Sequence, residues 1–361
     1  MKRSWPSYYL YLVSAALLGA LTGGILGCGV GTPSTGDGTL TVGFIYVGPK
    51  DDYGYNQAHA AGANAVRAIP GVDVKEEERV PDTDDVRKTM KSMIELDGAK
   101  LLFPTSFNYF DPHVLEVARE HPDVTLMHCG GLWDANQHPA NVGSFFGYID
   151  ECQYLSGVVA GKPIPQVLRN INAFTLGARS VDSLITCTVI FTGDWSIPVK
   201  EAEAATTLIN QGIDVLTCHV NSPKIVIESA ERRGIYTCGY HCNQANLAPK
   251  GYLTGAEWNW EKVYTDYVND FKAGKKVPNL IRGGLKQGIV KTSPYGPAVS
   301  EAAKIDADAA KAKFLDGSFV IFKGPLKDNA GKTVIEEGKS YVQTAIELES
   351  MNYLVEGVLG R

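Results

Sequence analysis

The chain has 361 residues, of which 44% are hydrophobic and 20% are charged, and its formal net charge is −6. This balance is typical of a globular protein, and the length beyond the N-terminal region exceeds what one hydrophobic core holds, so two domains are expected. The chain contains no run of Lys and Arg. This excludes nucleic acid as the expected partner, because binding to phosphates requires clustered positive charge.

The N-terminal segment predicts export and lipid attachment. Lys2 and Arg3 precede an apolar run that ends at Cys28. This arrangement resembles a bacterial lipoprotein signal, in which residues 1–27 are removed and Cys28 receives the lipid. Residues 28–39 are rich in Gly, Ser and Thr and are expected to form a flexible tether. An uncleaved transmembrane anchor is the alternative, since about 20 apolar residues suffice to span a bilayer. Either reading places the folded part outside the cytoplasm, held at the cell membrane.

From residue 40 onward the apolar pattern alternates between strands and helices. In the first series the predicted strands cover 40–47, 72–79, 101–104, 124–129 and 141–148. The predicted helices of this series cover 56–69, a segment that begins at Asp84, 112–120, and a segment that begins at Glu151.

A second series follows. Its predicted helices cover 165–180, 198–210, 222–233 and 260–273, and its predicted strands cover 184–191, 213–219, 235–239 and 252–257. Near the end, segments 318–323 and 332–335 flank a turn at 328–331, which predicts a β-hairpin. Strands that alternate with helices of this length form parallel sheets covered on both faces, and two such series indicate two lobes of similar design.

Six cysteines remain once Cys28 is assigned to lipid. An even number in an exported protein permits disulfides, and the sequence cannot choose among their pairings. Most of these cysteines lie in apolar, strand-like runs, where a thiol behaves as a small hydrophobic side chain. We therefore expect most of the six to be free thiols: Cys129, Cys152, Cys187, Cys218, Cys238 and Cys242.

Aromatic and amide side chains follow the predicted strands, and fixed charges are few there. Ligands of open parallel sheets bind outside the carboxyl ends of the strands. The residues we select at these positions are Tyr55, Asn56, Phe107, Asn108, Trp195, His241 and Trp258. A helix cap is the alternative role for Asn56, and the hydrophobic core is the alternative place for Phe107. Because aromatic rings stack on bases and Asn reads an adenine-like edge, the set favours a flat, neutral, nitrogen-rich ligand.

Several segments, in order and spacing, resemble the BMP (basic membrane protein) family of substrate-binding lipoproteins, which includes PnrA-like purine nucleoside receptors. The matching segments are 54–56, 151–157, 193–201, 324–329 and 351–357. The resemblance implies a type I periplasmic-binding-protein fold, α/β in class, with two doubly wound parallel-sheet lobes joined by three crossovers. It implies an N-terminal lobe of residues 40–148 plus 255–285 and a C-terminal lobe of 149–254 plus 286–361.

The resemblance also implies a mode of binding. Tyr55 and Asn56 occupy the place of a Phe-Asn pair that holds the purine, and Trp195 matches the aromatic residue on its other face. His241 stands where the nucleoside receptors have an Asp for the ribose, and Trp258 or its neighbour stands in place of a ribose-binding Lys. These departures favour a purine nucleobase over a nucleoside. If neutral His241 accepts a hydrogen bond from the ligand, affinity falls at acidic pH.

The expected function is therefore capture of an adenine-like purine base outside the cytoplasm and its delivery to the permease of an ABC importer. A purine nucleoside receptor and a membrane-tethered ligand sensor are the alternatives. We predict no cofactor and no metal, because zinc needs about four ligands that converge, whereas neighbouring residues on a strand point to opposite faces. We also predict no enzymatic activity: Cys242 beside His241 is the one candidate nucleophile, and no Gly-x-Ser-x-Gly, no phosphate loop and no paired carboxylates at a strand end occur.

Overall fold

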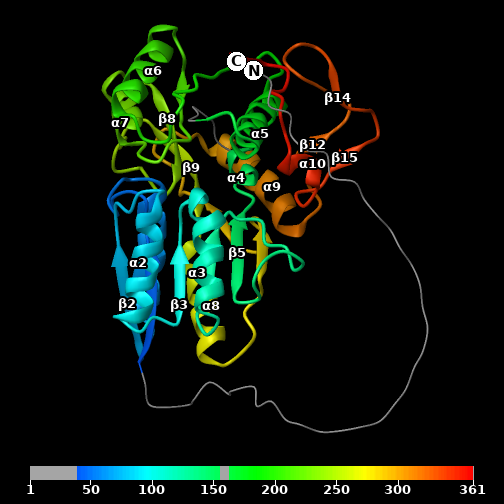
Figure 1. The fold of residues 1–361 in the computed structure, drawn as a ribbon. Helices are drawn as coiled ribbons and strands as arrows, with labels where there is room; N and C mark the ends of the chain where they lie inside the picture. Colours follow the sequence, from blue (N-terminus) through cyan, green and yellow to red (C-terminus); the bar gives the residue numbers. More distant parts are fainter. Residues whose placement is uncertain (1–38, 155–161, 361) are drawn as a thin grey trace, which may run out of the picture. The chain divides into compact units, whose positions relative to one another are not determined.

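A computed structural model describes residues 39–154 and 162–360 (Figure 1). The predicted signal peptide 1–27, the lipid-acceptor Cys28 and all of the tether but its last residue lie outside the described residues. Within the described ranges, no helix combines the length and apolar character needed to cross a membrane.

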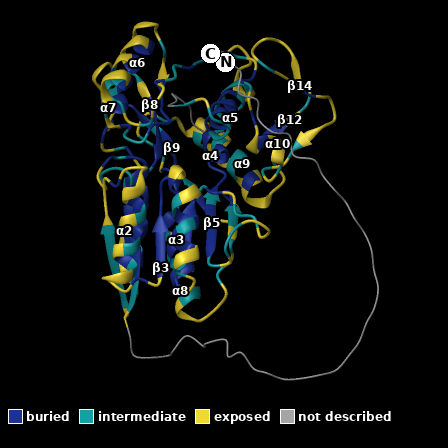
Figure 2. Ribbon diagram, viewed as in Figure 1, coloured by how far each residue is buried: buried dark blue, intermediate teal, exposed yellow. Residues whose placement is uncertain are grey.

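The larger of two main sheets has six strands, all parallel, in the order β10-β5-β4-β3-β1-β2. Its strands are β1 (Leu40–Ile45), β2 (Val72–Glu77), β3 (Leu101–Pro104), β4 (Thr125–Cys129), β5 (Val142–Gly147) and β10 (Leu280–Gly283). All four residues of β3 are buried, and Figure 2 shows this central strand in dark blue. A strand with both faces covered requires a continuous apolar run, which is what the sequence carries here.

Four helices cover this sheet: α1 (Tyr55–Arg67), α2 (Asp84–Glu95), α3 (Leu115–Glu120) and α8 (Trp260–Lys272). Helices α1 and α8 pack closely because Gly62 has no side chain: a Cβ there would lie 2.4 Å from the ring of Tyr264. Helix α3 begins three residues later than predicted. The predicted first residues, 112–114, belong to a separate π-helical segment (Phe110–Val114), in which Asp111 is extended (φ −120°, ψ 123°), as a residue before proline prefers.

The smaller sheet has the order β11-β9-β8-β7, in which β11 is antiparallel to β9 and the other pairs are parallel. Its strands are β7 (Val215–Leu216), β8 (Tyr236–His241), β9 (Tyr252–Trp258) and β11 (Val290–Thr292). The helices of this part are α4 (Asp150–Gln153), α5 (Pro165–Val181), α6 (Pro198–Asn210) and α7 (Lys224–Arg232). The parallel α/β architecture predicted from the sequence is confirmed.

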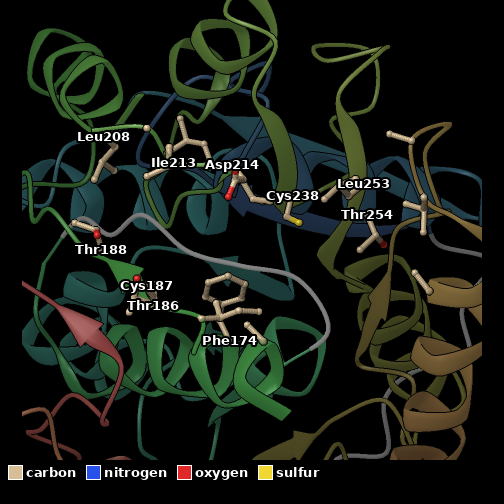
Figure 3. Close-up of a pocket in the computed structure, with 18 of the residues that line it drawn as sticks. Phe174, Thr186, Cys187, Thr188, Leu208, Ile213, Asp214, Cys238, Leu253 and Thr254 are labelled. Carbon is tan, nitrogen blue, oxygen red and sulfur yellow. The ribbon is translucent and has the colours of Figure 1, made fainter. Parts of the chain in front are cut away.

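The smaller sheet is interrupted next to β7. The strand predicted over 184–191 is reduced to β6 (Cys187–Thr188), which pairs with β16 (Val358–Leu359) and not with the sheet. A cavity of about 860 Å³ separates the two parts. Figure 3 shows Phe174 and Cys187 on one side of it and Asp214 on the other. None of the predicted ligand-binding residues lines this cavity.

The chain passes between the two main sheets three times, after β5, after β9 and after β10. The lobe boundary predicted at residue 255 falls inside β9, because this strand stays in the smaller sheet as far as Trp258. The boundaries predicted at 148/149 and 285/286 fall within the first and third crossings.

The segment after β11 differs most from the prediction. Helix α9 (Glu301–Asp316) is capped by Ser300, whose hydroxyl accepts from the backbone N–H of Ala303, and ends at Gly317 (φ +82°). Strands β13 (Leu326–Lys327) and β14 (Thr333–Ile335) form a hairpin around the predicted turn. The predicted first arm, 318–323, is wrong, since β12 (Phe322–Lys323) pairs with β15 (Ser340–Tyr341). A short helix, α10 (Ile346–Glu349), follows.

Candidate functional site

The loop between β1 and α1 is organised by a buried carboxylate. Asp52 accepts hydrogen bonds from the backbone N–H groups of Gly54 (2.9 Å), Asn56 (3.0 Å) and Gln57 (2.9 Å). These are donors that the first turn of a helix leaves without intrahelical partners. Burial raises the pKa of Asp52, and the same backbone hydrogen bonds oppose that rise. The loop therefore holds the first turn of α1 in a fixed position.

The side chain of Asn56 belongs to this loop. Its Nδ2 donates to Oδ2 of Asp52 (2.8 Å), and its Oδ1 accepts from the N–H of Gly48 (3.2 Å). Asn56 is buried and is not among the residues that line the cavity described below. The structure thus places Asn56 in the capping network, the alternative weighed from the sequence, and outside the lining of that cavity.

A second cavity lies where strand ends of both main sheets meet. Six of the seven predicted ligand-binding residues line it: Tyr55, Phe107, Asn108, Trp195, His241 and Trp258. Seven further residues complete the lining: Val47, Asp82, Ser106, Phe146, Gln166, His219 and Asn221. The cavity measures about 80 Å³, well below the roughly 300 Å³ at which small-molecule pockets begin. Entry of a heterocycle therefore requires the lining elements to move apart.

Tyr55, the first residue of α1, lines this cavity from the side of the larger sheet. Its hydroxyl donates to the carbonyl of Thr105, which fixes the ring, and burial raises the pKa of the phenol well above its usual value. The ring centroid lies 5.6 Å from that of His241, with the ring planes at 75°. Since His241 ends β8 of the smaller sheet, the two sheets contribute adjacent rings.

Trp195 lies in the segment between β6 and α6. Its carbonyl accepts from the N–H of Asn221 (2.7 Å), which ties the segment after β6 to the segment after β7. Its ring centroid lies 5.9 Å from that of His219, and Nζ of Lys162 lies 5.7 Å from the ring centroid. The structure therefore brings Trp195 and Tyr55 to one cavity, as the sequence predicted.

Stacked aromatic rings form one wall. Trp258 stacks on Trp260 with a centroid distance of 4.8 Å and an interplanar angle of 10°. The ring centroid of Phe146 lies 5.1 Å from that of Trp258, and the ring centroid of Phe107 lies 5.4 Å from that of Phe146 in an edge arrangement. Phe107 is 41% exposed, so it stands at the cavity's mouth and not in the core.

His241 is held tightly at the end of β8. Its backbone is in the left-handed region (φ +75°), and its Nδ1 accepts a hydrogen bond from the indole Nε1 of Trp258 (2.8 Å). Burial lowers the pKa of His241 well below its usual value, His219 and His59 lower it further, and the Val220 carbonyl opposes them. Nδ1 is therefore already occupied by Trp258 and cannot accept a hydrogen bond from a ligand. The predicted loss of affinity at acidic pH required such an acceptor, so its basis is removed.

Asp82 is a functional candidate that sequence reasoning missed. Its carboxylate accepts from Oγ of Ser106 (2.8 Å) and Nδ2 of Asn108 (2.8 Å), so Asn108 is oriented by it at the mouth. Asp82 lies five residues beyond β2, nearer to its strand than Tyr55 is to β1, and it was missed because only aromatic and amide side chains were sought at the strand ends. His219 and Asn221 lie three and five residues beyond β7, at a strand end that the sequence also indicates, but they were not among the selected residues.

The rival uses of these residues find no support in the geometry. Across the described ranges, no group of His, Cys, Asp and Glu is placed to hold a metal ion. The thiol of Cys242 donates to the carbonyl of Tyr53 (3.1 Å), and burial raises its pKa to about 12, opposite to what a nucleophile needs. None of the six described cysteines forms a disulfide, in agreement with the sequence.

Comparison with known proteins places these features in a family context. The family model for Bmp, described as ABC transporter substrate-binding protein PnrA-like, matches residues 39–321. A purine-binding protein of Brucella abortus (strain 2308) is 34% identical over 335 residues, which cover 88% of this chain and 93% of that protein. A putative ABC transporter glucose-binding protein of Haloferax volcanii is 28% identical over 340 residues, which cover 90% of this chain and 85% of that protein.

A solved structure is similar in fold. The ABC transporter solute-binding protein from Conexibacter woesei superposes with a TM-score of 0.64 at 20% sequence identity, and the match covers 78% of this chain and 97% of that one. At this identity the likeness concerns the fold alone.

Proposed function

Because the chain belongs to the Bmp family of PnrA-like ABC transporter substrate-binding proteins, we propose that it captures a purine nucleobase between its two lobes. The family binds small-molecule solutes outside the cytoplasm and does not consist of enzymes. The base, its delivery to the permease of an importer, and attachment to the membrane through a lipid on Cys28 are parts of the proposal.

The observation that carries the proposal is the composition of the cavity wall. Tyr55 at the start of α1 and Trp195 from the segment after β6 line one cavity with Phe107, Phe146 and Trp258. Each aromatic face that stacks on a base contributes on the order of 1–3 kcal/mol, whichever base it is. The 34% identical relative is named as a purine-binding protein, and this agrees with the aromatic wall.

The charges around the cavity favour a neutral ligand. Among the described residues, Asp82 is the one carboxylate in the lining, and its two oxygens are engaged by Ser106 and Asn108. No Lys or Arg of the described ranges lines the cavity. A phosphate or a carboxylate would require such a cation, because charge-assisted hydrogen bonds provide most of the affinity for these groups. Sugar phosphates and amino acids are accordingly disfavoured.

Binding is proposed to proceed by closure of the lobes. With about 80 Å³ of free space, the described arrangement corresponds to closed strand ends. The three crossings act as the hinge, the base enters when the strand ends separate, and the closed form is the one presented to the permease. A membrane-tethered sensor would use the same closure. An importer is distinguished by its ATPase, whose rate should rise when this protein and the base are added together.

A tryptophan substitution tests the proposal. We expect Trp195→Ala to weaken adenine, guanine or hypoxanthine binding by about ten- to a hundredfold in isothermal titration calorimetry, because one stacking face is lost. Trp133→Ala is the matched control, since Trp133 donates its indole N–H to the carbonyl of Pro139 and does not line the cavity. Tighter binding of inosine or guanosine than of any free base would replace the nucleobase by a nucleoside, and equal affinity of Trp195→Ala and wild type would remove the proposed site.

A further inference from the structure

The hydrogen bond between Trp258 and His241 determines which nitrogen of the histidine carries the proton. An indole N–H is a donor only. Because Nε1 of Trp258 donates to Nδ1 of His241 at 2.8 Å, Nδ1 must be the unprotonated nitrogen of the ring. In a neutral imidazole the hydrogen then sits on Nε2. Trp258 is itself 3% exposed and stacked on Trp260, so the donor that imposes this tautomer is held in place.

The protonated nitrogen is left without a partner. Among the described residues, Nε2 of His241 is buried and forms no hydrogen bond, while the ring lines the cavity between Tyr55 and Trp258. The Val220 carbonyl raises the pKa of His241, as a weak acceptor for the ring would, but no hydrogen bond of normal geometry joins it to Nε2. A buried donor without an acceptor is costly, and so is a left-handed backbone at a residue other than glycine. Both features fall on this one residue at the cavity wall.

We propose that His241 is a specificity-determining residue whose Nε2–H, fixed as a donor by Trp258, selects ligands that place a hydrogen-bond acceptor against it. This inference rests on the proposed function and narrows it. The ligand class becomes heterocycles with an unprotonated ring nitrogen or a carbonyl oxygen at that edge. A ring that presents N–H or C–H there leaves the donor buried and unpaired, and it is rejected by about ten- to a hundredfold.

The direction of this selection differs from that of a free histidine. A histidine that can exchange tautomers offers either a donor or an acceptor, and it discriminates weakly between the two kinds of ligand edge. Here the exchange would turn two N–H groups, those of Nδ1 and the indole, toward each other. Trp258 therefore acts as a positioning residue for His241, in addition to lining the cavity.

Ring-nitrogen analogues test the donor. The probes are adenine and its 1-deaza, 3-deaza and 7-deaza analogues, each of which replaces one ring nitrogen by C–H. By calorimetry, wild type is expected to bind at least one analogue ten- to a hundredfold more weakly than adenine. In His241→Asn this loss shrinks to within about threefold, because the amide is too short to reach, while Asn still tolerates a positive φ. Equal binding of adenine and all three analogues by wild type overturns the inference, and so does an unchanged preference in His241→Asn.

A tryptophan pair tests the role of the indole. Trp258→Phe keeps an aromatic ring but removes the donor, so the preference against the weakest analogue should fall several-fold. Trp133→Phe is the matched control, because Trp133 donates its indole N–H to the carbonyl of Pro139 and does not line the cavity. It should retain the wild-type preference, and thermal unfolding of both variants verifies that they are folded. Equal preference in the two variants would show that Trp258 does not position His241.

A measurement without ligand separates this inference from the proposed function. In ¹⁵N spectra of histidine-labelled wild-type protein, the expected state of His241 is a protonated Nε2 and an unprotonated Nδ1. A protonated Nδ1 overturns the inference whatever the protein binds. If the expected tautomer is present and adenine, guanine, hypoxanthine and inosine all fail to bind, the proposed purine function fails, and with it the ligand class assigned to His241.

Discussion

Tyr55 combines a structural and a binding role in different parts of one side chain. Its hydroxyl is engaged by the Thr105 carbonyl, whereas its ring lines the cavity. The hydroxyl hydrogen is therefore not available to a ligand, and the ring is. The two roles can be separated by substitution.

We expect Tyr55→Phe to lower the free energy of unfolding by about 1–2 kcal/mol, because the buried Thr105 carbonyl loses a donor. Purine affinity should stay within about threefold of wild type, since the ring remains. Urea unfolding and calorimetry measure the two quantities. Tyr53→Phe serves as the control, because Tyr53 carries Lys224 over its ring, at 5.1 Å, and does not line the cavity. A large loss of affinity in Tyr55→Phe with unchanged stability would contradict this division of roles.

At this scale the strand-end rule predicted six of the thirteen described residues that line the cavity. It selected Tyr55, Trp195 and His241 because each lies at the end of a strand, in the segment between a strand and the next helix, or at the first residue of that helix. It could not separate Asn56 from Tyr55, since the two residues are adjacent and only the direction of the helix start decides which one faces the cavity. It did not find Asp82, because only aromatic and amide side chains were sought after the strands.

At the scale of elements, helix α1 depends on its capping loop. Three backbone donors and the Asn56 amide converge on the carboxylate of Asp52. A cap of this kind contributes about 1–2 kcal/mol, and here it also orients Tyr55 at the first position of the helix.

Asp52→Ala is expected to lower the free energy of unfolding by about 2 kcal/mol, because buried donors at the start of α1 are left unpaired. Purine affinity should fall as well, since Tyr55 loses its fixed position. Asp51→Ala is the matched control, because Asp51 is adjacent to Asp52 in the sequence but is exposed. Urea unfolding that gives the same stability for both variants would rule out the capping role.

Elements with a strong apolar pattern were predicted correctly, and those without one were missed. Strand β3 matches its predicted bounds, because its short apolar run is buried on both faces inside a parallel sheet. Helix α9 was missed because its only buried residue is Phe314, so no apolar stripe marks it. The run 184–191 has a strand pattern, but the length of a strand also depends on its neighbours in the sheet. A cavity separates this run from β7, so only Cys187 and Thr188 pair, with β16.

At the scale of the whole molecule, buried histidines couple stability to pH. Burial lowers the pKa of His59 to about 3, of His128 to about 4 and of His219 to about 3, and it lowers that of His241 well below the usual value. In the unfolded chain these residues titrate near about 6.5. The unfolded state therefore binds more protons in mild acid, and stability falls as pH falls below this value.

We expect the free energy of unfolding to decrease between about pH 7 and pH 5, by roughly 2 kcal/mol for each of the four histidines. Glu151 opposes part of this loss, because burial raises its pKa to about 7 and its protonation in the folded state adds stability as pH falls. Urea unfolding at several pH values measures the net slope. A stability that is flat or rising toward pH 5 would mean that these histidines are protonated in the folded protein.

The threefold passage of the chain between the sheets has a practical meaning for fragments. Residues up to Gly147 lack β10, the edge strand of the larger sheet, and also α8, which packs on α1 through Gly62 and Tyr264. A truncated piece would therefore expose the apolar face of α1 to water. A protease that nicks any one connection, by contrast, leaves two others intact. Half-molecules are poor starting material for crystallography or display, whereas a singly cleaved protein keeps both halves in register.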